Sequence, residues 1–118
     1  AFSLLFIGCE RGDEVEPALV PAARTSPAAE RAIESISAAR CDHEQRCSTI
    51  GPTSEYMTRE HCLNVMRADG FDELGICRLG IDQDKLSGCL AQIANQTCGA
   101  PFELARIAAC RSDELCLD

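Results

Sequence analysis

Nine cysteines in 118 residues constrain this chain more than any other feature. One of them, Cys9, stands near the N-terminus. The other eight follow from residue 41 onward: Cys41, Cys47, Cys62, Cys77, Cys89, Cys98, Cys110 and Cys116. A cysteine content this high in a short chain is typical of a disulfide scaffold. The even set of eight predicts four disulfides within one domain of an exported protein.

The rest of the composition supports that prediction. A chain of this length holds one domain, and its large side chains are few, with no Trp, one Tyr and four Phe. A core of aliphatic residues and half-cystines is marginally stable by burial alone. Four disulfides at about 2–4 kcal/mol each supply what burial lacks. The fold therefore favours an oxidising compartment.

The formal net charge is −8. Such a surface repels phosphate backbones, which argues against nucleic acid as a partner. It also argues against docking by charge onto anionic lipid headgroups. Any attachment to a membrane should come from a hydrophobic anchor.

Residues 1–9 are apolar up to Cys9, and Phe6-Ile7-Gly8-Cys9 resembles the bacterial lipobox. The resemblance implies that residues 1–9 are the C-terminal part of a lipoprotein signal peptide and that Cys9 carries the lipid. An ordinary leader that ends near Gly8 is the alternative, but it would leave Cys9 as an odd half-cystine. Glu10 after the anchor is compatible with delivery to the outer membrane. Anchorage in the inner membrane is the alternative.

Residues 10–26 are predicted to be a disordered tether, because acidic residues, Pro17 and Pro21 are mixed there without periodicity. A flexible chain of this length spans roughly 20–25 Å. The expected domain is then residues 27–118, an all-α, four-helix bundle stapled by disulfides and monomeric.

Four helices are predicted from caps and apolar spacing. The first starts at Ser26-Pro27 and stops before Gly51-Pro52, and the second is capped by Thr58 and runs over 59–69. Gly70 should end that helix and open a loop over 70–81. The third follows Asp82. The fourth runs from Pro101 to about Cys110, and 112–116 forms a last turn.

Eight half-cystines allow 105 pairings, so the sequence alone leaves the connectivity open. Two pairs are suggested by the expected helix positions. Cys47 with Cys62 would close an antiparallel helix pair, and Cys77 with Cys116 would tie the glycine-containing loop to the tail.

Several short motifs carry a family resemblance: Ala39-Arg-Cys-Asp-His-Glu-Gln-Arg-Cys47, Ile50-Gly-Pro, Tyr56 with Thr58-Arg-Glu-His-Cys62, Gly80-Ile-Asp82, Cys89-Leu-Ala-Gln-Ile93 and Ala108-Ala-Cys-Arg111. Together they resemble a cysteine-rich lipoprotein family from myxobacteria. Members of that family are described as associated with natural-product biosynthesis. The resemblance implies no reaction, no cofactor and no catalytic residue.

Catalytic and metal chemistry find little support in the residues. The spacing typical of paired zinc ligands is absent from Cys41-Asp-His43, Cys47 and His61-Cys62. The sequence also contains no Cys-x-x-Cys motif, which is where redox-active thiols usually lie. His43 should be a hydrogen-bonded, half-buried imidazole, and His61 should lie at the surface. Adjacent acidic pairs are explained by solvated turns. We expect no enzyme, no metal site and no cofactor.

Binding is the class of function that remains. If Tyr56 and Phe71 lie on exposed loops at the ends of the second helix, they are candidate contacts for a protein partner. The leading hypothesis is a membrane-tethered, non-enzymatic accessory or interaction module. A lipoprotein that binds a small ligand or metabolite is the first alternative. An enzyme inhibitor or degenerate enzyme is the second.

Overall fold

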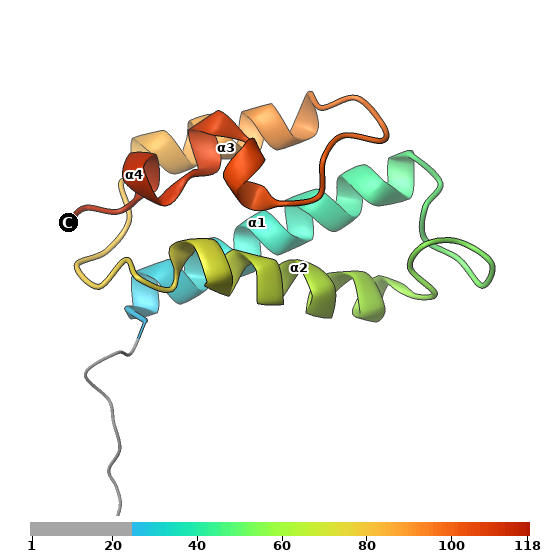
Figure 1. Ribbon diagram of the computed structural model, residues 1–118, viewed down its shortest axis with the longest axis horizontal. Helices are drawn as coiled ribbons and strands as arrows, with labels where there is room; N and C mark the ends of the chain where they lie inside the picture. Colours follow the sequence, from blue (N-terminus) through green and yellow to red (C-terminus); the bar gives the residue numbers. More distant parts are fainter. Residues whose placement is uncertain (1–24) are drawn as a thin grey trace, which may run out of the picture.

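The computed structural model describes residues 25–118, so Cys9 and most of the predicted tether lie outside it. Three long helices form the body: α1 (Pro27–Arg46), α2 (Arg59–Leu74) and α3 (Gln83–Ala94). Two 3₁₀ turns (Leu104–Arg106 and Ala108–Cys110) and the short helix α4 (Ser112–Leu115) complete the chain. The helices lie side by side and alternate in direction, and the C-terminal segment returns along them (Figure 1). The predicted all-α class is confirmed. Residues 25–118 contain four α-helices, but the fourth is the short α4 and not the segment over 101–110 that was predicted.

The arrangement gives the molecule two ends (Figure 1). The Cys77 end comprises the start of α1, residues 75–82 and residues 115–118. The Cys47 end comprises the last turns of α1 with residues 47–58 and 95–103.

The three predicted helix starts are confirmed. The side chains of Ser26, Thr58 and Asp82 each accept a hydrogen bond from a backbone N–H three residues on. Pro27 occupies the first helical position of α1, where its missing N–H has no helical partner to lose. Local capping chemistry is therefore enough to predict where the three helices start.

The predicted end of the second helix is wrong. Helix α2 continues through Gly70 and stops at Leu74, with Gly75 as its C-cap. Gly70 is buried, and a Cβ built on it would lie 2.9 Å from Cγ2 of Ile33 on α1. Gly70 thus serves close packing between two helices and not helix termination.

The predicted fourth helix over 101–110 is also wrong. This segment forms the two 3₁₀ turns, separated by extended backbone at Ile107. Its polar backbone groups bind side chains of other helices: Arg40 donates to the carbonyl of Phe102, and Asp69 accepts from the N–H of Leu104 at 2.8 Å. These contacts replace the bonds that a regular helix would make within itself.

The buried apolar residues form two clusters. The main core lies between α1, α2, α3 and the C-terminal segment, and its fully buried side chains include Ile33, Leu74 and Ile93. The small cluster lies at the Cys47 end and consists of Cys41, Tyr56, Cys62 and Met66.

All eight cysteines of the domain are paired: Cys41–Cys62, Cys47–Cys98, Cys77–Cys116 and Cys89–Cys110. The predicted pair Cys77–Cys116 is confirmed, and the predicted pair Cys47–Cys62 is wrong. Cys41 and Cys47 are six residues apart, which is a rotation of about 240° around a helix. They therefore face different neighbours, and Cys41 is the one that faces α2.

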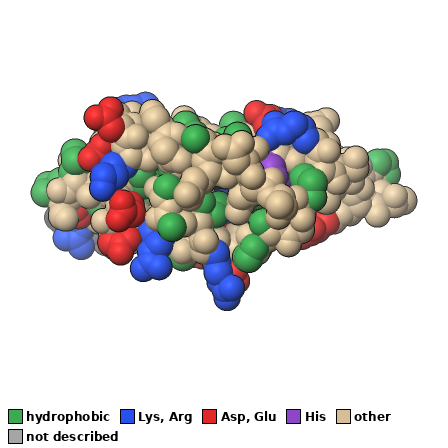
Figure 2. Space-filling model, turned by 90° about the horizontal axis from the view of Figure 1, so that it is seen from above, with side chains coloured by type: hydrophobic (Ala, Val, Ile, Leu, Met, Phe, Trp, Pro, Cys, Tyr) green, Lys and Arg blue, Asp and Glu red, His purple; other side chains and the backbone are tan. Residues whose placement is uncertain are grey.

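Acidic and basic side chains are interspersed over the face seen from above (Figure 2). Among the described residues, no helix is both long enough and apolar enough to cross a bilayer.

Candidate functional site

The candidate site is a polar pocket at the Cys47 end. It lies between α1, α2, the loop over residues 49–56 and the loop over residues 96–102, and its volume is about 90 Å³. One water molecule takes up about 30 Å³ in the liquid. The pocket therefore holds a few waters or a very small ligand.

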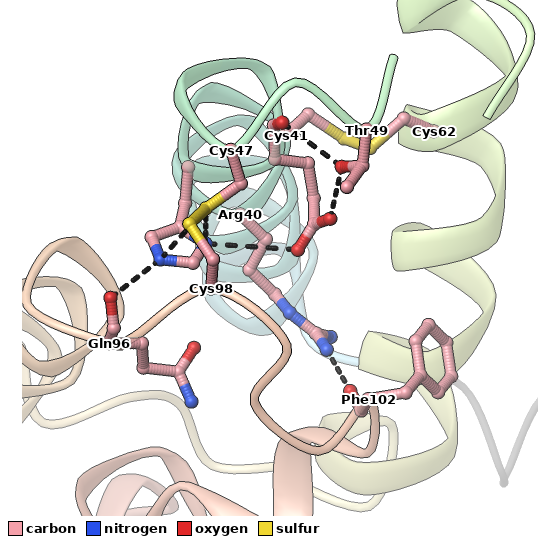
Figure 3. Close-up of polar contacts among 10 residues, drawn as sticks. Arg40, Cys41, Cys47, Thr49, Cys62, Gln96, Cys98 and Phe102 are labelled. Carbon is pink, nitrogen blue, oxygen red and sulfur yellow. Dashed lines mark hydrogen bonds and ion pairs between the residues drawn. A yellow bond between two sulfur atoms is a disulfide. The ribbon is translucent and has the colours of Figure 1, made fainter. Parts of the chain in front are cut away.

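Arg40 forms the floor of this pocket and is 5 % exposed. Its Nη1 lies 2.7 Å from Oδ2 of Asp69, and Nη2 donates to the carbonyl of Phe102. The guanidinium also lies 5.2 Å from the centre of the Phe102 ring, which is within reach of a cation–π interaction. Figure 3 shows the guanidinium directed at the Phe102 carbonyl. The buried charge is thus neutralised and held in place by groups of the protein itself.

His43 forms one wall. Its Nε2 lies 2.8 Å from the backbone carbonyl of Gln96, so Nε2 carries a proton and donates it to that oxygen. The other ring nitrogen lies 3.7 Å from the Glu44 carboxylate, and Sγ of Cys47 lies 3.9 Å from the ring. The prediction of a hydrogen-bonded His43 is confirmed, although the ring is buried and not half-buried, being 5 % exposed.

Tyr56 also lines the pocket. Its pKa is raised above the ordinary value of 10.0, first because the phenol is buried and then because the carboxylates of Glu55 and Glu44 face it. The positive charge of Arg40 partly opposes that shift. Thr49 donates a hydrogen bond to the Glu44 carboxylate and thereby fixes the loop that carries Tyr56. At neutral pH the phenol is therefore protonated.

Two disulfides flank the pocket (Figure 3). Cys41–Cys62 joins α1 to α2, and Cys47–Cys98 joins the end of α1 to the loop over 96–102. The Cys41–Cys62 bridge is fully buried, whereas Cys98 is exposed. The pocket is therefore a cross-linked junction between three chain segments.

Residues 41–118 match a family model described as a family of unknown function, DUF6184. The chain belongs to this family. No curated protein and no solved structure matches the chain. The matched region begins at Cys41 and so includes all four disulfides of the DUF6184 domain.

In the DUF6184 domain the two candidate partner contacts lie in different environments: Tyr56 is buried and Phe71 is exposed. Tyr56 is 5 % exposed and belongs to the small cluster, so it does not lie on an exposed loop as the hypothesis required. Phe71 is 42 % exposed and lies within α2. It borders an open groove of about 350 Å³ with Pro27 and three charged residues of α1, Glu30, Arg31 and Glu34.

The structure describes all of the other predicted site residues except Cys9. The eight half-cystines are paired as described above, and Cys9 lies outside the described residues. His61 is exposed, as predicted. Within residues 25–118, no three His, Cys, Asp or Glu side chains come together as a metal site.

The pair of Arg40 with Asp69 was not predicted from the sequence. A signal existed, because Arg40 continues the apolar spacing of Ile33 and Ile36 on α1, and Asp69 follows Met66 by three residues on α2. Charged residues at such positions indicate a buried pair. The two partners are nevertheless 29 residues apart, and only the packing of α1 on α2 joins them.

Proposed function

We propose that this chain is an exported accessory module that is held at a bacterial membrane by a lipid on Cys9 and acts by binding, without catalysis. Four disulfides in a small helical domain indicate an oxidising, extracytoplasmic environment. The association with natural-product biosynthesis comes from the sequence resemblance alone, and the proposal includes it as a context without a named reaction.

The observation that carries the binding role is the construction of the polar pocket. Arg40 is neutralised by Asp69, and Nε2 of His43 is engaged by Gln96. The volume of about 90 Å³ is below the several hundred Å³ of a typical ligand or substrate site. These groups stabilise a rigid body, and a rigid body suits recognition by its outer surface.

Disulfide pairing supports the role of Cys9. Each of the eight other cysteines is bonded to another of the eight, so none of them remains for Cys9. The lipobox resemblance of residues 6–9 gives that thiol a use. Two or more acyl chains on one residue hold a protein firmly at a bilayer.

The test of anchoring compares Cys9→Ser with Glu10→Gln in the native host. We expect the first variant to leave the membrane fraction and the second to remain, because only Cys9 carries the lipid. Mass spectrometry of the N-terminal peptide of the membrane-bound protein should show acyl chains. Retention of Cys9→Ser in the membrane fraction would refute lipid anchoring.

The test of binding uses a photo-crosslinking phenylalanine analogue in place of Phe71, with the same analogue in place of Met57 as control. Both side chains are exposed, but only Phe71 borders the α1 groove. We expect a discrete crosslinked protein from position 71 alone. Equal products from both positions, or none from either, would contradict a protein partner at this groove.

A small-ligand role is the second candidate. The groove beside Phe71, at about 350 Å³, has the volume of a ligand site, but it is open to solvent. A small molecule of the host crosslinked to position 71, with no protein product at that position, would favour this candidate.

A further inference from the structure

The Cys77 end carries a group of exposed aliphatic side chains that the function proposed above does not use. Leu79 is 72 % exposed, Ile76 is 64 % exposed and Leu117 is 57 % exposed. We name these three residues the Leu79 patch. Hydrophobic side chains are visible at this end among charged ones in Figure 2.

The patch is built by the fold and is not a frayed tail. The disulfide Cys77–Cys116 brings its two segments together, with Cα atoms 4.9 Å apart. The N–H of Leu117 donates to the carbonyl of Gly80 at 3.0 Å, and the N–H of Leu79 donates to the Asp118 carboxylate at 3.2 Å. Gly80 has a φ of +122°, so a left-handed backbone conformation at glycine allows this approach.

The polypeptide enters the domain beside the same patch. Thr25 donates a hydrogen bond to the carbonyl of Gly75 at 3.0 Å, and Ser26 donates one to the carbonyl of Cys77 at 2.8 Å. The residue that joins the domain to the upstream chain is therefore fixed to the loop that carries Ile76 and Leu79. Figure 1 shows the start of α1, the loop after α2 and the C-terminal segment at one end.

We propose that the Leu79 patch docks on the surface of the lipid bilayer in which Cys9 is anchored; this rests on the lipid anchorage proposed above. Residues 10–24 alone separate Cys9 from Thr25. The 20 residues of α1 extend about 30 Å from there toward the Cys47 end. The Cys77 end is therefore the end of the domain nearer to the anchor along the chain, and docking of the patch would fix that end against the bilayer and point the Cys47 end away from it.

Covalent attachment explains how so small a patch suffices. A short tether raises the effective concentration of the patch at the bilayer to the millimolar range, so a weak contact becomes populated. The net charge of −8 disfavours anionic headgroups. The expected contact is apolar, with the aliphatic side chains in the interfacial region, and it should form on zwitterionic lipid.

The experiment places a single fluorophore at each end of the molecule. The chain contains no Trp, so Leu79→Trp reports on the Cys77 end, and Met57→Trp, at a side chain that is 62 % exposed, reports on the Cys47 end. Residues 9–118, which contain the whole described fold, are oxidised and then coupled through the Cys9 thiol to a maleimide phospholipid. The lipid-linked protein is incorporated into phosphatidylcholine vesicles with and without brominated acyl chains.

We expect the emission of Leu79→Trp to shift to shorter wavelength and to be quenched by brominated lipid, with neither change for Met57→Trp. A second pair guards against a local effect of the new ring: quenching of Ile76→Trp should fall when Leu79→Asp is added, with the far-ultraviolet circular dichroism unchanged.

Equal quenching at both ends, or none at Leu79→Trp, would overturn the docking proposal. A shift that depends on protein concentration without vesicles would also overturn it, because a second copy of the chain would then cover the patch.

The chemical link makes this result independent of lipidation in the cell. If Cys9→Ser stays in the membrane fraction but Leu79→Trp is quenched on vesicles, the cellular anchorage fails and the affinity of the patch stands. If Cys9→Ser is released and Leu79→Trp is not quenched, the anchorage stands and the docking fails.

Discussion

The two ends of this molecule hold their chain segments together by different means. At the Cys77 end, backbone hydrogen bonds and one disulfide join two segments whose aliphatic side chains face outward. At the Cys47 end, two disulfides and the buried pair of Arg40 with Asp69 join segments around a polar pocket. The main core extends along the molecule between the helices, whereas the small cluster lies at the Cys47 end. At the Cys47 end, where few apolar side chains are buried, disulfides and a buried ion pair thus hold the chain segments together.

The largest expected effect tests whether the Cys47 end depends on its buried charge pair. Asp69→Ala leaves Arg40 buried without its carboxylate, and it should lower the free energy of unfolding by about 3–5 kcal/mol. The matched control is Glu114→Ala, which breaks an exposed pair with Lys85 and should cost about 0–1 kcal/mol. Urea denaturation with the disulfides intact measures both. Similar losses in the two variants would remove the distinction between the ends.

Glycine substitutions test the apolar half of the comparison. Gly70→Ala drives a methyl group against Ile33, since the built Cβ lies 2.9 Å from that side chain. It should cost about 1–3 kcal/mol of stability. Gly88→Ala, in α3 with no atom within 4 Å of its Cβ, should instead add about 0.5–1 kcal/mol. Thermal melts measure both effects. If the melting temperatures of both variants lie above, or both below, that of the unsubstituted protein, the packing described is wrong.

Selective reduction tests the difference in exposure between the disulfides. Cys98 is exposed, whereas Cys41, Cys62, Cys89 and Cys110 are fully buried. Because thiol–disulfide exchange requires access to a sulfur atom, a limiting amount of dithiothreitol should reduce Cys47–Cys98 first. Alkylation and peptide mapping identify the opened bridge. Earlier opening of Cys77–Cys116 would show that the Cys77 end is the less protected one.

The smallest effect concerns Tyr56, the one tyrosine of the chain. Its pKa in the folded protein is raised above 10 by burial and by the neighbouring carboxylates, so the folded state keeps a proton that the unfolded state loses near pH 10. The resulting stability is fully present below pH 10 and is lost as the pH rises through the folded pKa. Absorbance titration at the phenolate band should therefore give a higher midpoint for native protein than for reduced, urea-unfolded protein. Coincident titration curves would mean that Tyr56 is solvated and that the pocket wall is open.

The amino-acid sequence by itself determined the helical class, the helix starts and the presence of four disulfides. These depend on caps, on apolar spacing and on cysteine parity, all of which act over a few residues or by simple count. The disulfide connectivity stayed open: of the two pairs that the helix positions suggested, Cys77–Cys116 is formed and Cys47–Cys62 is not.

Only the tertiary structure decided the end of α2, the conformation of residues 101–110 and the partner of Cys47. Gly70 continues its helix because Ile33 of another helix packs against it. Residues 101–110 do not form a regular helix, because Arg40 and Asp69 bind the backbone of Phe102 and Leu104. Such contacts join residues far apart in the chain, and their free energy exceeds the local propensities from which a sequence is interpreted. The same packing sets the chain entry and the Leu79 patch at one end, a relation that no local pattern contains.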